Sequence, residues 1–107
     1  MSKAILIEVD GTVRRIEINS YDDLKCGVGG FIELIRLGDT GQFAYVNEDG
    51  IELNLPYNHK ATELCYRHNV GLMLGDYIKG NMVIVGPPDD DGEETDVSEA
   101  IAVELQV

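Results

Sequence analysis

Residues 31–46 read FIELIRLGDTGQFAYV, and this stretch decides the fold class. Residues 31–37 are mostly apolar, and a strand there would place Glu33 and Ile35 on one face and Leu34 and Arg36 on the other. Residues 42–46 are again rich in apolar and aromatic side chains. Both patterns are typical of β-strands. The Gly-Asp-Thr-Gly sequence between them, at residues 38–41, is typical of a turn. The stretch therefore predicts two strands joined by a short turn.

The segments on either side of this pair add further strands. Short apolar runs predict buried strands at residues 4–7 and 82–85. A further strand is expected at residues 12–18, because the Asp10-Gly11 dipeptide before it is a strong signal for a hairpin turn. Apolar and polar residues alternate over residues 51–55, so a half-buried strand is expected there as well.

Two helices are expected between these strands. The first follows Ser20, which suits an N-cap, and ends at the glycine-rich residues 27–30. The second follows the N-cap residue Asn58 and ends near Gly71. Its predicted core stripe has helical spacing and comprises Ala61, Leu64, Cys65 and His68.

A third helix is expected at residues 97–106, behind a capping-box pattern formed by Asp96 and Glu99. The resulting order of elements lacks the regular strand–helix alternation of a parallel sheet. We therefore expect an α+β domain with a largely antiparallel sheet and two or three short helices. A length of 107 residues suits one compact domain over residues 1–107, with an acidic loop at residues 87–95.

The charge of the chain narrows the class of partner. Twenty acidic residues against eight Lys and Arg give a formal net charge of −12. Because nucleic-acid binders carry a basic patch and anionic membranes attract basic segments, we expect neither as a partner. No apolar run approaches the roughly 18 residues of a membrane span. Two cysteines are too few for a disulfide framework, so we expect a cytoplasmic location.

The motifs that carry catalysis or metal binding are incomplete here. The glycines of residues 27–30 lack the Lys and Ser or Thr of a phosphate-binding loop. Residues 47–50 and 89–92 resemble calcium loops, yet neither has Asp at the first ligand position. Cys65 and His68 make at most half a zinc site. We therefore expect no catalysis, no metal and no cofactor, with only weak cation binding left open for the acidic loop.

The scarce bases point to a different kind of site. Basic side chains near backbone amides hold anions, and a helix N-terminus favours phosphate or carboxylate. The ligand-binding residues predicted on this basis are Arg36, Tyr57, Asn58 and Lys79. The alternative is structural: Arg36 and Lys79 pair with acids, and Asn58 serves a cap.

Several stretches of the chain resemble a family of small proteins of unknown function that phages, plasmids and bacteria encode. The matching stretches are VGGFIE at 28–33, NEDG at 47–50, LPYN at 55–58, Ala61-Thr62, GDYIKG at 75–80 and VIVG at 83–86. The resemblance covers most of the chain. It implies a shared fold and an accessory role in a mobile element, and it transfers no catalytic residues. Asn47 and Asn58 are the polar positions that match the family pattern, so Asn47 is added to the predicted ligand-binding residues. The structural alternative for Asn47 is a turn residue.

From these observations we expect a phage or mobile-element accessory protein that sequesters an anionic small molecule, a nucleotide-like immune signal, without catalysis. A homo-oligomer is expected because a domain this small has little interior in which to bury a ligand. If the protein is viral, the location is the cytoplasm of the host. Two alternatives remain open: an acidic mimic of DNA that inhibits a host enzyme, and an interaction module with a host protein partner.

Overall fold

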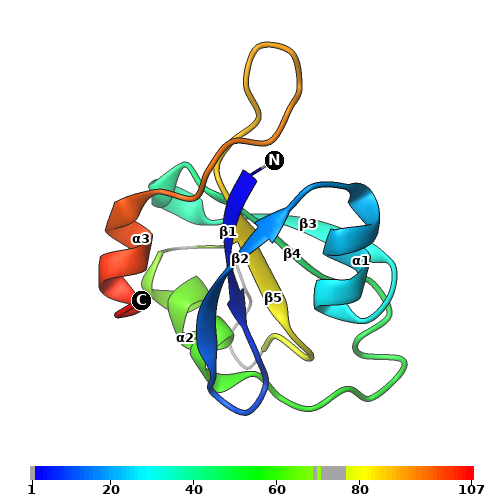
Figure 1. The fold of residues 1–107 in the computed structure, drawn as a ribbon. Coiled ribbons are helices and arrows are strands. Elements are labelled where there is room, and N and C mark those ends of the chain that lie inside the picture. Colours follow the sequence, from blue (N-terminus) through cyan, green and yellow to red (C-terminus); the bar gives the residue numbers. More distant parts are fainter. Residues whose placement is uncertain (1, 69, 71–76) are drawn as a thin grey trace.

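The computed structural model describes residues 2–68, 70 and 77–107 of the chain. Five strands and three α-helices follow one another, with a short 3-10 helix, η1, between β3 and β4. The strands are β1 (Ser2–Ile7), β2 (Val13–Ile18), β3 (Ile32–Arg36), β4 (Phe43–Asn47) and β5 (Met82–Val85). The helices are α1 (Tyr21–Val28), η1 (Gly38–Thr40), α2 (His59–Arg67) and α3 (Glu99–Glu104). The α+β class and the single compact domain are therefore confirmed (Figure 1).

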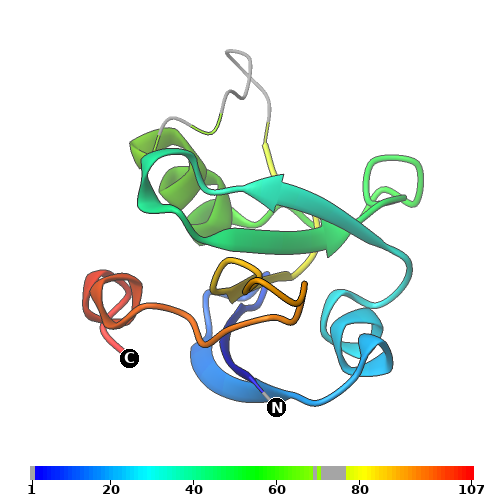
Figure 2. The same cartoon turned by 90° about the horizontal axis from the view of Figure 1, so that it is seen from above.

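The five strands form one sheet in the order β2-β1-β5-β4-β3. Every neighbouring pair is antiparallel, as expected. β5 lies at the centre, and its four residues are buried because other elements cover both of its faces. The outermost strands are β2 and β3, so the sheet has two edges (Figure 2).

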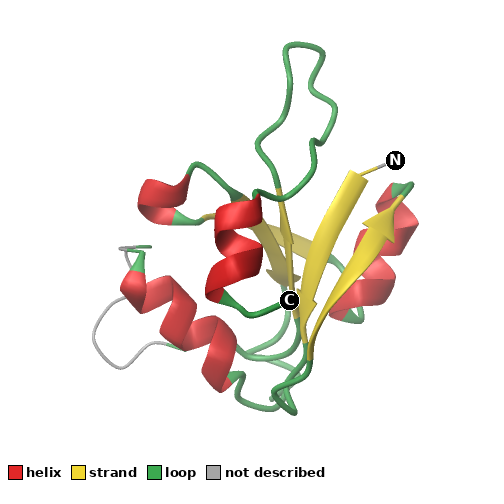
Figure 3. Ribbon diagram, turned by 60° about the vertical axis from the view of Figure 1, so that its left-hand side comes forward, coloured by secondary structure: helices red, strands yellow, loops and turns green. Residues whose placement is uncertain are grey.

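Helices cover the two faces of the sheet unequally. On one face, α2 and α3 pack against the sheet through Leu64, Cys65 and Ile101. On the other face, α1 packs through Leu24 and Val28. Figure 3 shows α2 and α3 on one side of the strands and α1 on the other. The buried side chains accordingly form two separate apolar clusters.

The helix ends are set by local hydrogen bonds. Asn58 caps α2 as expected, because its Oδ1 accepts from the backbone N–H of Ala61 at 3.0 Å. The cap of α3 is Ser98, whose Oγ accepts from the N–H of Ile101, whereas the predicted Asp96 accepts from the N–H of Lys3. The predicted helix at residues 97–106 therefore shortens to Glu99–Glu104.

One predicted strand is wrong. Residues 51–54 form turns, and Ile51 and Leu53 are 77% and 60% exposed. The backbone N–H of Leu53 bonds to Asp49 O, and the N–H of Leu55 bonds to Gly50 O. The segment thus closes on its own preceding residues and cannot join the sheet. Only Tyr57, farther along, makes an isolated bridge, to Lys79.

Other boundaries differ slightly from the prediction. The helix α2 ends at Arg67, and the predicted end near Gly71 lies outside the described residues. Ser20 precedes α1 without a side-chain cap, while Asp23 accepts instead from the N–H of Asn19. Gly29 then ends α1 with a positive φ of 80°, a conformation that glycine adopts without strain.

The acidic arm, residues 87–95, projects from the body of the domain (Figure 1). Backbone bonds from Gly86 N to Thr95 O and from Asp89 N to Glu93 O join its two limbs. The side chain of Asp89 also accepts from two backbone N–H groups within the arm. Among the described residues, no helix has the length and apolar character that crossing a membrane requires.

Candidate functional site

The structure does not bring the five predicted ligand-binding residues together. Asn47 and Asn58 are buried, Lys79 is half-buried, and Arg36 and Tyr57 are exposed. Arg36 ends β3 and Asn47 ends β4, whereas Asn58 precedes α2. Tyr57 and Lys79 are the one pair in direct backbone contact.

The side chain of Asn58 is committed to the backbone. It is 1% exposed, and its Nδ2 donates to the carbonyls of Ile7 at 3.1 Å and Gly80 at 2.9 Å. With its Oδ1 capping α2, the amide has partners on three different segments. The geometry therefore favours the structural alternative for Asn58, because a ligand would have to displace these bonds.

Asn47 has a similar role at the end of β4. Its Nδ2 donates to Val28 O, and its Oδ1 accepts from the N–H of Asp49. A Cβ added at Gly30 would lie 2.8 Å from this Nδ2, so glycine allows the close approach of the α1–β3 connection. The amide of Asn47 thus holds the loop after α1 against the turn after β4.

Tyr57 and Lys79 belong to a small aromatic cluster on the surface. The ring of Tyr57 lies 4.8 Å from that of Tyr77 and 4.1 Å from that of His59, measured between centroids. The Nζ of Lys79 donates to Asn54 Oδ1 at 2.9 Å and lies 5.6 Å from the Tyr77 ring centroid. The ammonium of Lys79 is therefore already partnered by an amide oxygen and a ring face.

Arg36 lies apart from this cluster. Its guanidinium lies 5.6 Å from the ring centroid of Phe43, its cross-strand neighbour. Both residues lie at the end of the β3–β4 pair that leads into η1. Arg36 therefore cannot share a small ligand with Asn58 without a rearrangement of the fold.

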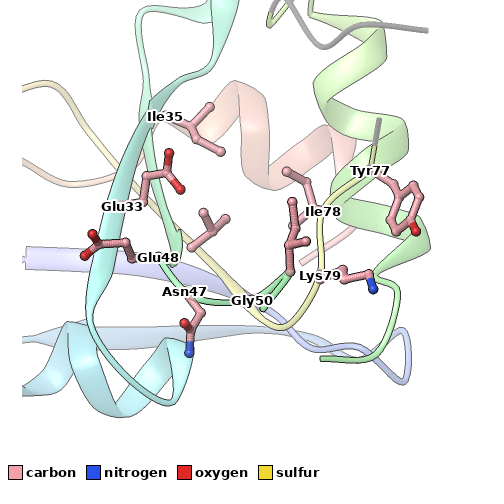
Figure 4. A pocket seen from close by; sticks show the side chains of 10 residues that line it. Glu33, Ile35, Asn47, Glu48, Gly50, Tyr77, Ile78 and Lys79 are labelled. Atoms are coloured by element: carbon pink, nitrogen blue, oxygen red, sulfur yellow. The ribbon is translucent and has the colours of Figure 1, made fainter. Parts of the chain in front are cut away.

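A hollow of about 380 Å³ lies on the α2 side of the β3–β4 pair, and we call it the β3 hollow. Its lining comprises Glu33, Ile35, Val46, Asn47, Glu48, Gly50, Ile51, Tyr77, Ile78 and Lys79. The side chains of Ile35 and Ile78 point toward its middle (Figure 4). Its volume is in the range of small-ligand pockets, and its surface is more apolar than polar.

Glu33 is the ionisable group that faces this apolar surface. Its carboxylate turns toward the hollow, whereas Glu48, Tyr77 and Lys79 point away from it (Figure 4). A carboxylate beside an apolar surface favours a ligand that combines an apolar body with a cationic or hydrogen-bond-donating group. The arrangement does not favour a ligand with several negative charges.

Two titratable groups of the described residues have strongly raised pKa values. Burial raises the pKa of the Cys65 thiol to about 11, so this thiol stays protonated at neutral pH. Burial and the nearby Glu94 carboxylate raise the pKa of Tyr45 to about 12. No group of three His, Cys, Asp or Glu in residues 2–68, 70 and 77–107 is arranged to hold a metal ion.

One family model, described as a domain of unknown function (DUF3846), matches residues 1–106. The chain belongs to this family. The match supports the expected membership of an uncharacterised family, and it carries no activity, ligand or partner. No curated protein matches the chain. No solved structure matches it either, so the site has to be judged from its own geometry.

Two residues of the β3 hollow, Asn47 and Lys79, were among the predicted site residues, whereas Glu33 and the apolar lining residues were not. Successive residues of a strand face opposite sides, so a strand over residues 31–37 does place Glu33 and Ile35 on one face, which is the signal that was available. The alternation could not show that Val46 and Ile78 would lie beside them. Those neighbours come from the pairing of β3 with β4 and from the return of the chain before β5.

Proposed function

We propose that this DUF3846 domain is a non-catalytic binding protein whose ligand enters the β3 hollow with an apolar group and a cationic group. The observation that carries the proposal is the hollow itself: an apolar surface of Ile35, Val46 and Ile78 with the Glu33 carboxylate turned toward it. Burial of the apolar part supplies affinity, and the charged pair fixes orientation.

The proposal has a direct test with a small probe. Isoamylamine has a branched apolar body and an ammonium group, and isoamyl alcohol is its uncharged counterpart. In methyl NMR spectra of the full chain, isoamylamine should shift the signals of Ile35, Val46 and Ile78 at millimolar concentration. The alcohol should bind less tightly, since it cannot pair with Glu33.

Two substitutions separate this site from general attraction to an acidic protein. Glu33→Gln should weaken isoamylamine binding by about two- to fivefold, the effect of one partly exposed charge pair, and leave the alcohol unaffected. Glu48→Gln removes the same charge from the same lining, at a side chain that points away, and should change little. Equal effects of the two substitutions, or unshifted hollow methyl signals, would contradict the proposal.

Sequestration of an anionic, nucleotide-like immune signal by a mobile-element protein is a second candidate. The observation that favours it is Lys79 in the lining of the hollow, whose ammonium would have to leave Asn54 and turn inward to meet an anion. With Glu33 and Glu48 in the same lining, the ligand would have to carry a single anionic group and otherwise present hydrogen-bond donors.

Native mass spectrometry of gently purified protein distinguishes the two candidates. A retained molecule that absorbs like a nucleobase and is lost in Lys79→Ala would support sequestration. The same measurement gives the number of subunits, so it also tests the expected homo-oligomer. A ligand-free chain that binds isoamylamine through Glu33 would favour the cationic ligand.

A further inference from the structure

The outer edge of β3 presents unpaired backbone groups. β3 is the last strand of the sheet, and no strand in the described part of the chain lies beyond it. The bonds Glu48 N to Phe31 O and Leu37 N to Gln42 O show which residues face β4. Because antiparallel pairs alternate, the N–H and C=O of Ile32, Leu34 and Arg36 point outward.

The side chains along this edge are accessible on both faces. Leu34 is 46% exposed on the α1 side, and Glu33 is exposed on the α2 side, where it borders the β3 hollow. An edge strand with outward backbone groups and an apolar residue at its middle is a template for a further strand. The hollow lies beside the same strand, where side chains of an added strand would reach it.

We propose that the outer edge of β3 binds an extended, basic segment of another protein as a sixth strand. This inference rests on the proposed function, because one side chain of the segment enters the β3 hollow. Backbone bonds to Ile32, Leu34 and Arg36 supply sequence-independent affinity. Side chains that alternate between the two faces supply selectivity.

The geometry specifies the segment that fits. In an antiparallel arrangement, the residue opposite Leu34 is apolar and covers that side chain. The segment residue that follows this apolar residue lies opposite Glu33 and is Lys or Arg. The segment residue that precedes the same apolar residue lies opposite Ile35 and is apolar. A basic segment also matches the net charge of −12, which attracts a basic partner over long range.

A second copy of this chain fits the edge less well. Self-pairing that uses all three outward residues centres on Leu34, and it sets Glu33 of each copy opposite Ile35 of the other. Each β3 hollow then receives a carboxylate in place of a cation. Two chains that each carry a charge of −12 also repel one another.

The test uses the full chain and a synthetic seven-residue peptide with blocked ends. Its central residue is Val, placed to face Leu34, with Lys on the Glu33 side, Leu on the Ile35 side and Thr elsewhere. The control peptide has the same sequence with N-methyl groups on the amides that would bond to β3. Solvent-exchange NMR then measures the individual β3 amides, and methyl spectra measure the hollow.

The peptide is expected to slow amide exchange at every second residue of β3. At about nine-tenths saturation, exchange of the Ile32, Leu34 and Arg36 amides should slow about tenfold, because only free protein exchanges. The amides of Glu33 and Ile35 already bond within the sheet and should change little. Glu33→Gln should weaken binding of the peptide about two- to fivefold, and Glu48→Gln should leave that binding unchanged.

The outcomes separate this inference from the proposed function. Hollow methyl signals that shift with isoamylamine, combined with β3 amides that stay unprotected by the peptide, overturn the sixth strand and leave the hollow as a site. Equal binding of the N-methylated control also overturns the sixth strand. If neither probe shifts the hollow methyl signals, both proposals fail. Concentration-dependent protection without peptide would assign the edge to a second copy and overturn the basic partner.

Discussion

The two edges of the sheet differ in how the rest of the chain treats them. At β2, which we call the closed edge, the Arg15 guanidinium pairs with Glu99 of α3 at 3.2 Å and donates to Val107 O at 3.1 Å. At β3, the open edge, the middle residue is the half-exposed Leu34, and no described helix has an ion pair to the strand.

The comparison teaches which edge is available to a partner. Natural sheets protect their edges with charged residues and covering elements, because exposed edges promote unwanted pairing. The sequence VRRIEI of β2 has three charged residues, and one of them, Arg15, pairs with Glu99 of α3. The sequence IELIR of β3 has two charged residues, and no described helix has an ion pair to it, so its outer edge stays accessible to a partner.

The largest expected effect is a loss of stability from a substitution in α3, the helix that pairs with the closed edge. Ile101 is 2% exposed and fixes α3 to the apolar cluster that α2 also covers. Ile101→Ala should lower the free energy of unfolding by about 3 kcal/mol, since the lost side chain leaves a cavity. Chemical denaturation measures this change. Val103→Ala, on the same helix at a 74% exposed position, should stay within about 0.5 kcal/mol.

The next largest loss of stability is expected at Asn58, whose side chain bonds to Ile7 of β1, the strand next to the closed edge, and to Gly80 and α2. Asn58→Ala removes the cap of α2 and leaves the carbonyls of Ile7 and Gly80 without their partner. We expect a loss of about 2–3 kcal/mol in the free energy of unfolding. Asn58→Ser keeps a capping oxygen and should recover about 1 kcal/mol. If Asn58→Ala changed ligand affinity without changing stability, Asn58 would belong to a binding site after all.

A smaller effect concerns the ion pair at the closed edge. Hydrogen bonds and charge attraction from Arg15 lower the pKa of Glu99 below its ordinary value. The pair therefore contributes its stability above the ordinary pKa of a glutamate, and that contribution is lost as the pH falls through the lowered pKa. Arg15→Gln should raise the pKa of Glu99, as measured by NMR titration of its carboxyl carbon. Arg14→Gln, which disrupts a pair with Glu8 instead, should leave the pKa of Glu99 unchanged.

The smallest effect on stability is expected at the open edge. Leu34→Ala should change the free energy of unfolding by about 0.5 kcal/mol or less, because nearly half of the side chain already contacts water. The same substitution should weaken binding of the synthetic peptide, since it removes the apolar contact at the centre of the added strand. A loss of stability as large as that of Ile101→Ala would show that Leu34 belongs to the core and would contradict the description of β3 as an open edge.

Most of the fold follows from local patterns. The strands at residues 4–7 and 82–85 and the cap at Asn58 were predicted because their signals lie within a few residues of one another. Residues 51–55 alternate apolar and polar side chains, which also predicted a strand, and yet residues 51–54 form turns, because amides of this segment bond to Asp49 and Gly50 nearby. Alternation alone does not say which neighbour a strand will find.

The candidate site is less predictable than the fold. Asn47 was predicted as a ligand contact from the family resemblance and Asn58 from its place at a helix N-terminus, but their bonds to Val28, Ile7 and Gly80 become visible only in the folded chain. Lys79 was expected to hold an anion, and its partner Asn54 lies 25 residues earlier. Side-chain partners across such separations depend on the path of the backbone, which local spacing does not encode.

The sequence by itself determined the fold class, the non-parallel order of strands and helices, the family and the acidic character, because periodicity, turn residues and charge are local or additive properties. The tertiary structure decided which strands end the sheet, which edge strand has an ion pair to α3, and that Glu33 lies beside Ile35, Val46 and Ile78. These are properties of pairing between distant segments, and they arise only when strands align in register and bury their apolar faces together.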